Sequence, residues 1–182
     1  DTQITKDILE RAKNLKVIVR AGIGVDNIDV GAATQKGVIV MNTPSGNTIT
    51  TAEHAISMLL SLCRHIPQAT GSLKAGEWAK KRFIGLEIFN KTLGIIGLGN
   101  VGRIVADRAI GLKMKVIAYD PFISKEAAEK LSVTLVQMDD LLSQSDFVTI
   151  HVPFTDQTRH LINQQTFKKM KKGALLIQCA RG

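Results

Sequence analysis

The sequence has 182 residues, of which 45% are hydrophobic and 22% are charged. This length is enough for one domain and part of a second, and the composition is that of an ordinary globular protein. Nothing in it resembles a signal peptide, and no apolar run is long enough to span a membrane. The two cysteines, Cys63 and Cys179, lie far apart without metal-ligand spacing. We therefore expect a cytoplasmic protein with no membrane partner and no metal.

The net charge of +8 would suit a protein that binds polyanions. However, the basic residues stand in short clusters, Lys80–Arg82 and Lys168–Lys172, with no aromatic residues between them. The second cluster lies where we expect a helix to end, so it complements the helix dipole. We therefore expect no nucleic-acid partner, whereas anionic small molecules fit the charge equally well.

The first 43 residues predict alternating helices and strands: a helix over 4–13, a strand over 16–20, a helix over 30–36 stopped by Gly37, and a strand over 38–41. Gly22 and Gly24 follow the first strand. Two glycines after a strand indicate a turn where the backbone approaches something closely. This turn is either merely tight or an anion site of backbone N–H groups, with Arg20 beside it as a charge partner.

The segment 42–47 is the best candidate for a domain boundary, because it is rich in turn formers and precedes a long helix. We expect Thr50 or Thr51 to cap this helix and Pro67 to stop it. Residues 68–90 are polar and basic, with one Trp and two Phe. They are expected to form a further helix and an extended arm that packs on a partner subunit.

The most informative stretch is an apolar strand that runs into Gly97-x-Gly99-x-x-Gly102, followed by a helix and by a second strand that ends at Asp120. Gly97 permits the tight turn, Gly99 lets a pyrophosphate approach the backbone, and Gly102 lets the helix pack close to the strand. Strand, glycine turn, helix and acid in this order predict a dinucleotide-binding unit. The alternative is a glycine-rich turn in another α/β fold.

In such a unit the pyrophosphate sits at the helix N-terminus, where unpaired N–H groups and the positive end of the dipole point at it. Asp120 follows Gly102 by eighteen residues, so its carboxylate can accept hydrogen bonds from the adenosine ribose. The same negative charge would repel a 2′-phosphate. The expected cofactor is therefore NAD rather than NADP.

Strands and helices continue to alternate toward the C-terminus. We expect helices over 125–131 and 138–142 and one ending over 167–172, with strands over 133–136, 146–150 and 174–178. This alternation predicts a doubly wound parallel sheet, the Rossmann fold.

These motifs resemble the D-isomer-specific 2-hydroxyacid dehydrogenases. The resemblance covers essentially the whole chain and rests on residues 20–29, 42–47 with 52–54, 97–102, 151–153 and 179–182. It implies an active site between two domains. Residues 1–43 would be the end of the first segment of a flavodoxin-like substrate-binding domain. Residues 44–182 would be the NAD-binding domain, incomplete at its C-terminal end.

The reaction implied by the resemblance is hydride transfer between C2 of a 2-hydroxy acid and C4 of nicotinamide. Arg181 matches the arginine that holds the substrate carboxylate and polarises the C2 oxygen, although Gln178 stands where asparagine is usual. Without the resemblance, Arg181 would be interpreted as a surface ion-pair residue. The family's catalytic Glu and His would lie beyond residue 182, so we expect these 182 residues alone to be inactive.

Further cofactor contacts implied by the resemblance, mostly through the backbone, are Ile23, Asn100, Val101, His151, Val152, Pro153, Cys179 and Ala180. The implied substrate contacts are Arg20, for a phosphate or carboxylate, and the backbone of Gly24 and Val25, with Asn47 as a further candidate. Cys179 is either a redox-sensitive thiol or, more simply, a small apolar residue at the end of a strand.

Within the family, the chain is most similar to members that oxidise 3-phosphoglycerate to 3-phosphohydroxypyruvate in L-serine biosynthesis. Arg20 fits this substrate, because a phosphate needs more positive charge than a lone carboxylate. The alternatives are a hydroxypyruvate/glyoxylate or D-lactate dehydrogenase and a non-enzymatic NAD-sensing scaffold on the same fold. Arg181 argues against the scaffold. The resemblance also implies a homodimer or homotetramer formed through the NAD domain.

Overall fold

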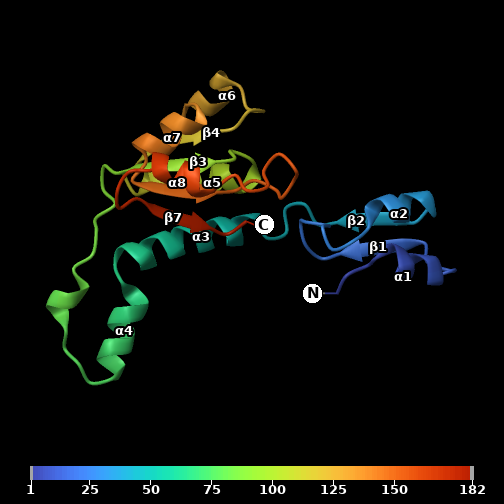
Figure 1. Ribbon diagram of the computed structural model, residues 1–182, viewed down its shortest axis with the longest axis horizontal. Helices are drawn as coiled ribbons and strands as arrows, with labels where there is room; N and C mark the ends of the chain where they lie inside the picture. The colour runs from blue at the N-terminus through green and yellow to red at the C-terminus, as the bar shows by residue number, and fades with distance from the viewer. Residues whose placement is uncertain (1, 181–182) are drawn as a thin grey trace. The chain divides into compact units, whose positions relative to one another are not determined.

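The structure is a computed structural model that describes residues 2–180 (Figure 1). The chain divides into two compact units after Thr48, directly beyond the turn-forming segment 42–47. The chain stays bound to the first unit beyond the end of the strand at Asn42, because the Thr43 N–H donates to the Gly22 carbonyl at 3.0 Å. The start of the turn is thereby held to the first unit.

The first unit consists of α1 (Lys6–Arg11), β1 (Val17–Arg20), α2 (Val30–Gln35) and β2 (Ile39–Asn42). The two strands pair in parallel, with Arg20 opposite Asn42 at their carboxyl ends. Asp29 caps α2, since its side chain accepts a hydrogen bond from the Ala32 N–H at 2.8 Å. The apolar core of this unit contains Leu9, Ile18, Ile28, Ala32, Ala33 and Val38.

The second unit contains a five-stranded parallel sheet in the order β5-β4-β3-β6-β7. Its strands are β3 (Thr92–Ile96), β4 (Lys115–Tyr119), β5 (Thr134–Leu135), β6 (Phe147–Ile150) and β7 (Leu175–Gln178). The chain proceeds outward from β3 to β5 and then crosses to β6 on the other side. The strand order therefore reverses between β3 and β6, and ligands bind at the carboxyl ends of strands at such a point. The prediction of a doubly wound Rossmann sheet is confirmed.

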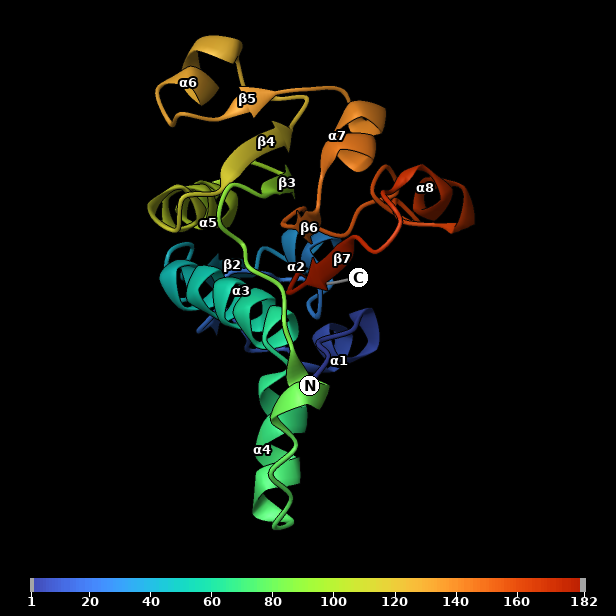
Figure 2. The same ribbon diagram turned by 90° about the vertical axis from the view of Figure 1, so that its left-hand side faces the viewer.

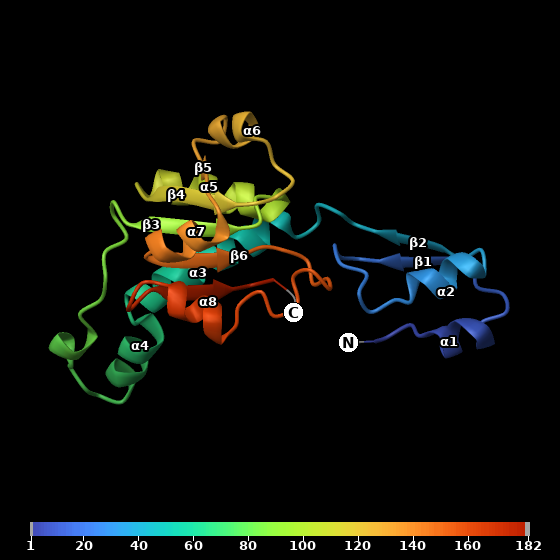
Figure 3. The same cartoon turned by 45° about the horizontal axis from the view of Figure 1, so that its top comes forward.

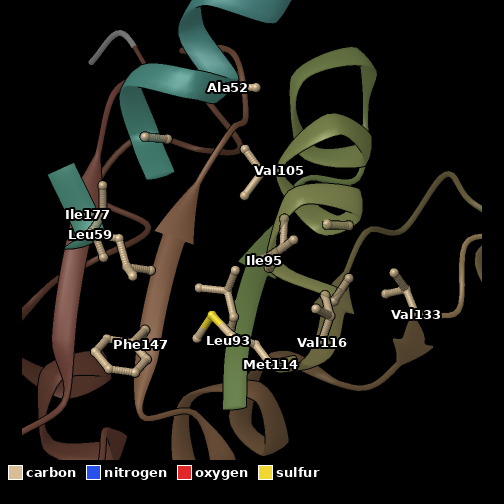
Figure 4. Close-up of a cluster of buried hydrophobic side chains, with 14 of the residues drawn as sticks. Ala52, Leu59, Leu93, Ile95, Val105, Met114, Val116, Val133, Phe147 and Ile177 are labelled. Atoms are coloured by element: carbon tan, nitrogen blue, oxygen red, sulfur yellow. The ribbon is translucent and has the colours of Figure 1, made fainter. Parts of the chain in front are cut away.

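Helices cover both faces of this sheet (Figure 2): α3 (Thr48–Cys63) and α5 (Asn100–Gly111) lie on one face, and α7 (Met138–Gln144) and α8 (Gln164–Lys169) lie on the other. The short α6 (Lys125–Glu129) precedes the edge strand β5. Figure 4 shows the larger core cluster, in which Leu59 of α3 and Val105 of α5 meet Ile95 and Phe147 of the sheet. Burial of both sheet faces explains why these strands are almost continuously apolar in sequence.

Two expectations about the long helix are wrong. The helix α3 begins at Thr48, directly after the turn, so Thr50 and Thr51 lie within its first turn rather than before it. The helix ends at Cys63 because His65 adopts the left-handed conformation, with φ 52°. Pro67 does not stop it. Pro67 instead lies in the first turn of the next helix, where a missing N–H leaves no hydrogen bond unmade.

That next helix, α4 (Ile66–Lys74), and the 3₁₀ helix η1 (Lys80–Phe83) form an arm that projects away from the sheet (Figure 3). The chain returns along residues 84–91, where the Leu86 N–H donates to the Cys63 carbonyl at 2.8 Å. This part of the chain matches the predicted helix and extended arm. Trp78 and Ile84 on the arm are 81% and 78% exposed, so apolar surface remains uncovered there.

Candidate functional site

The turn between β3 and α5 has glycine wherever a side chain would collide. Gly97 has φ +93°, and a Cβ on it would lie 2.8 Å from Val152 Cγ1. A Cβ on Gly102 would lie less than 3.0 Å from the carbonyl oxygen of Gly97. Gly99 is different, because a Cβ there would meet nothing within 4 Å. The open space beside Gly99 is what a phosphate group would need in order to approach the backbone.

The N-terminus of α5 lies at this open space. Gly99 is the N-cap residue, and no side chain caps the helix. The N–H groups of Asn100 and Val101 at the start of the helix are therefore left without a side-chain acceptor, at the positive end of the dipole. Such a helix start fits the pyrophosphate of a dinucleotide.

Two charged side chains hold the tip of the glycine turn from opposite sides. Asp120, at the end of β4, accepts from the Leu98 N–H at 2.8 Å and from the Phe122 N–H at 2.9 Å, one bond on each carboxylate oxygen. Arg103 Nε donates to the Leu98 carbonyl at 3.1 Å. Each carboxylate oxygen of Asp120 retains a further lone pair, which suits acceptance from ribose hydroxyls.

Sequence reasoning did not single out Arg103. The signal was present, however, because side chains in a helix lean toward its N-terminus. A basic residue in the first turn after a glycine motif therefore reaches back over the turn, as Arg103 does here.

The other residues proposed to contact the cofactor lie at the ends of β6 and β7. His151, Val152 and Pro153 follow β6 directly, while Cys179 and Ala180 follow β7. The Ala180 N–H donates to Gln178 Oε1 at 2.9 Å. The glutamine that stands where asparagine is usual therefore binds the neighbouring backbone. Parallel strands bring these segments to the same edge of the sheet as the glycine turn.

A cavity opens beside them at the ends of β6 and β7. Its lining is mainly apolar and includes Ile150, Val152, Pro153, Leu161, Ile162 and Leu176. At its rim the Arg159 guanidinium lies 4.7 Å from the centroid of the Phe154 ring. The lining from Phe154 onward was not predicted, because loop residues carry no periodic pattern that places them over a strand end.

His151 is half-buried, and burial lowers its pKa to about 4. The Thr149 hydroxyl lies 3.0 Å from His151 Nε2, within hydrogen-bond distance. The folded protein therefore keeps this imidazole neutral at pH 7.

This pKa gives a testable effect on stability. Between pH 6.5 and about 4 the unfolded state binds a proton at His151 and the folded state does not, so acidification through this window favours unfolding. We expect His151→Gln to remove this part of the pH dependence, which amounts to no more than about 3 kcal/mol. Urea unfolding at pH 7 and pH 4.5 measures it.

The matched control is His160→Gln, at an exposed loop position. This variant should keep the pH dependence of the unchanged protein. An equal loss of stability on acidification in the His151 variant and the unchanged protein would contradict the assignment.

Cys179 is half-buried, and burial raises the pKa of its thiol. Burial likewise raises the pKa of the Cys63 thiol. A raised pKa disfavours the thiolate, which is the reactive form. The geometry therefore favours the interpretation of Cys179 as a small residue at a strand end.

The residues proposed to contact the substrate belong to the first unit. Arg20 ends β1, and its Nη1 donates to the Gly24 carbonyl at 2.5 Å and to Asn27 Oδ1 at 2.6 Å. Gly24 and Val25 lie in the loop that follows. Ile23 precedes them, and Asn47 is the last residue before α3. The predicted catalytic residue, Arg181, lies outside the described residues.

Other kinds of site find no support between residues 2 and 180. In that part of the chain no three His, Cys, Asp or Glu side chains come together as a metal-binding group. None of its helices combines the length and the apolar character needed to cross a bilayer.

Comparison with known proteins identifies the family. Residues 56–182 match the D-isomer specific 2-hydroxyacid dehydrogenase, NAD binding domain. The chain is 54% identical to D-3-phosphoglycerate dehydrogenase of Archaeoglobus fulgidus over 100% of its own length and 34% of that protein. It is 49% identical to hydroxypyruvate reductase of Thermotoga maritima, covering 58% of that protein. The chain thus spans about a third to rather more than half the length of these relatives.

A solved structure agrees with this assignment. The crystal structure of D-lactate dehydrogenase from Aquifex aeolicus, complexed with NAD and lactic acid, is 31% identical and has a TM-score of 0.89. The match covers 99% of this chain and 54% of that one. NAD, expected from the glycine turn and Asp120, is confirmed as the cofactor of this domain. The chain therefore belongs to the D-isomer-specific 2-hydroxyacid dehydrogenase family.

Proposed function

We propose that this chain is part of an NAD-dependent dehydrogenase that oxidises 3-phosphoglycerate to 3-phosphohydroxypyruvate, a reaction that leads to L-serine. The observation that carries the substrate assignment is the 54% identity to D-3-phosphoglycerate dehydrogenase of Archaeoglobus fulgidus over the whole chain. The glycine turn, the uncapped start of α5 and Asp120 supply the cofactor part of such a site.

We propose that different residues bind different parts of the cofactor. NAD, when bound, accepts a hydride from C2 of the substrate. The N–H groups of Asn100 and Val101 would bind its pyrophosphate, Asp120 the adenosine ribose, and the segment from His151 to Pro153 the region of the adenine. The backbone at Cys179 and Ala180 would contact the cofactor near the reacting end.

The substrate would be held by its negative charges. We propose that the backbone N–H groups of Gly24 and Val25 bind its carboxylate, together with Arg181, which would also polarise the C2 oxygen. Asn47 is a further candidate for the same substrate. The residue that takes the hydroxyl proton would lie beyond residue 182, and the 182 residues alone should bind NAD without turnover.

The test is a substrate panel on the full-length protein, followed by the absorbance of NADH. Turnover of 3-phosphoglycerate with a higher kcat/KM than glycerate, glycolate or D-lactate would support the proposal. Hydroxypyruvate reductase of Thermotoga maritima, at 49% identity, makes reduction of hydroxypyruvate the second candidate. A higher kcat/KM for hydroxypyruvate than for 3-phosphohydroxypyruvate would favour it. NAD binding without turnover of any of these acids would favour the non-enzymatic scaffold.

We further propose that the protein is a cytoplasmic homodimer or homotetramer that assembles through the NAD domain and has neither nucleic-acid nor membrane partners. Both cysteines are free, which suits a reducing compartment. The arm carries the apolar surface that an interface needs, since Leu73, Trp78 and Ile84 are all more than half exposed. A second copy of the chain would cover this surface.

We expect Trp78→Ser to convert the assembly to smaller species, because a large aromatic side chain at an interface commonly supplies about 2 kcal/mol or more of binding free energy. Light scattering coupled to size-exclusion chromatography measures the mass. Phe167→Ser is the matched control, because Phe167 is 53% exposed on α8, away from the arm. Unchanged mass in the Trp78 variant at low micromolar concentration would place the interface elsewhere.

A further inference from the structure

We propose that Arg20, Asn27 and Asn42 are positioning residues: they hold the carbonyl groups of the loop after β1 on its inner side, so that three consecutive N–H groups face outward toward the substrate carboxylate. This inference rests on the proposed function, and it assigns Arg20 a use other than direct binding of a phosphate.

Every carbonyl from Gly22 to Val25 is already engaged within the first unit. The Gly22 carbonyl accepts from the Thr43 N–H at 3.0 Å, and the Val25 carbonyl accepts from the Ile28 N–H at 2.9 Å. The two carbonyls between them accept hydrogen bonds from side chains. Asn42 Nδ2 donates to the Ile23 carbonyl at 2.7 Å, and Arg20 Nη1 donates to the Gly24 carbonyl at 2.5 Å.

The N–H groups of the same loop are not used. Among the residues that the structure describes, no hydrogen bond has the N–H of Ile23, Gly24 or Val25 as its donor. The planar trans peptide links the two observations, because the carbonyl of one residue and the N–H of the next point in opposite directions. Fixing the carbonyls of residues 22, 23 and 24 therefore turns the N–H groups of residues 23, 24 and 25 the other way.

Arg20 is committed to this arrangement. Besides the Gly24 carbonyl, its Nη1 binds Asn27 Oδ1 at 2.6 Å and lies 4.0 Å from Asp26 Oδ1. Its side chain is only 24% exposed. Asn27 is held in turn, since its Nδ2 donates to the Thr2 carbonyl at 2.8 Å. An arginine bound in this way fixes the conformation of the loop, and its positive charge faces oxygen atoms of the protein itself.

The ligand chemistry follows from the unused donors. Three successive N–H groups at the carboxyl end of a strand suit an anionic group, because they offer hydrogen bonds without a buried counter-charge. Every 2-hydroxy acid carries a carboxylate, whether or not it is phosphorylated. The positioning residues should therefore affect phosphorylated and unphosphorylated substrates alike.

The experiment measures kcat and KM of the full-length protein in the reductive direction, with 3-phosphohydroxypyruvate and with hydroxypyruvate. We expect Asn42→Ala and Arg20→Ala each to raise KM about tenfold for both substrates, as for a lost hydrogen bond to a charged group, with little change in the KM for NADH. Arg20→Lys should recover part of the loss, since an ammonium can reach a carbonyl. Asn14→Ala and Arg11→Ala, at exposed positions in the same unit, are the matched controls.

Two results would overturn the inference. A rise in KM for the phosphorylated substrate alone in Arg20→Ala, with Asn42→Ala unchanged, would show that Arg20 binds the phosphate directly. Lower melting temperatures in both variants with unchanged KM would show that the network only stabilises the fold. Failure of the proposed function looks different, because the unchanged protein would then reduce hydroxypyruvate with a higher kcat/KM than 3-phosphohydroxypyruvate, or would bind NADH yet reduce neither substrate.

Discussion

Replacing Gly102 by alanine is expected to abolish measurable NAD binding and to lower the free energy of unfolding by about 1–3 kcal/mol or more. The added Cβ would lie less than 3.0 Å from the Gly97 carbonyl oxygen, which is backbone and cannot rotate away. The helix must then move off the strand, and the N–H groups at its start move with it. Urea unfolding reports the stability, and isothermal titration with NAD reports the binding.

The same helix offers a matched control. A Cβ on Gly111, the last residue of α5, would meet nothing within 4 Å. Gly111→Ala should therefore leave NAD binding unchanged and leave stability equal or higher by up to about 1 kcal/mol. If the Gly102 variant bound NAD as tightly as the Gly111 variant, the close approach of helix and strand would not be what positions the cofactor.

The sequence predicts this part of the molecule well because its constraints are local. A glycine is needed where φ is positive at position 97 and where backbone meets backbone at position 102, and both needs appear directly as residue identity. The parallel strands are equally visible, since burial on both faces leaves continuous apolar runs. The spacing to Asp120 then follows from the length of one helix and one strand.

The helix break shows where local reasoning fails. Proline was the expected stop because it cannot donate in a helix interior, but the chain turns two residues earlier, at His65. A left-handed histidine has no sequence signature, and the contact that accompanies it comes from residues far along the chain. The Leu86 N–H binds the carbonyl of Cys63, the last residue of α3.

For the loop after β1, prediction from the sequence fails for a different reason. Its glycines and Arg20 predict an anion site, and this stays a prediction. Which groups face inward depends on hydrogen bonds from Asn42, on the neighbouring strand, and from Thr43. No pattern in the sequence shows that a side chain on one strand holds the carbonyl of a loop on another. The sequence therefore shows the charge of Arg20 but not which groups that charge contacts.

Asp120→Asn is expected to weaken NAD binding by about tenfold to a hundredfold and to reduce the preference for NAD over NADP. The carboxylate holds the Leu98 and Phe122 N–H groups. We expect it to have a second function, which is to present negative charge to the ribose. The amide keeps only one acceptor oxygen, so one backbone bond is lost. Because it is also uncharged, repulsion of a 2′-phosphate disappears, and binding of NADP should fall much less than binding of NAD.

Arg103→Met separates these two functions. Arg103 also holds the glycine turn, since its Nε donates to the Leu98 carbonyl, but it presents no negative charge to a ribose or a 2′-phosphate. It should weaken NAD and NADP binding by the same factor, whereas Asp120→Asn should change their ratio. Arg108→Met, at an exposed position on the same helix, is the control for loss of a cation. Dissociation constants of NAD and NADP for each variant test these expectations. An unchanged ratio in the Asp120 variant would mean that the carboxylate only shapes the turn, and that selectivity for NAD arises elsewhere in the site.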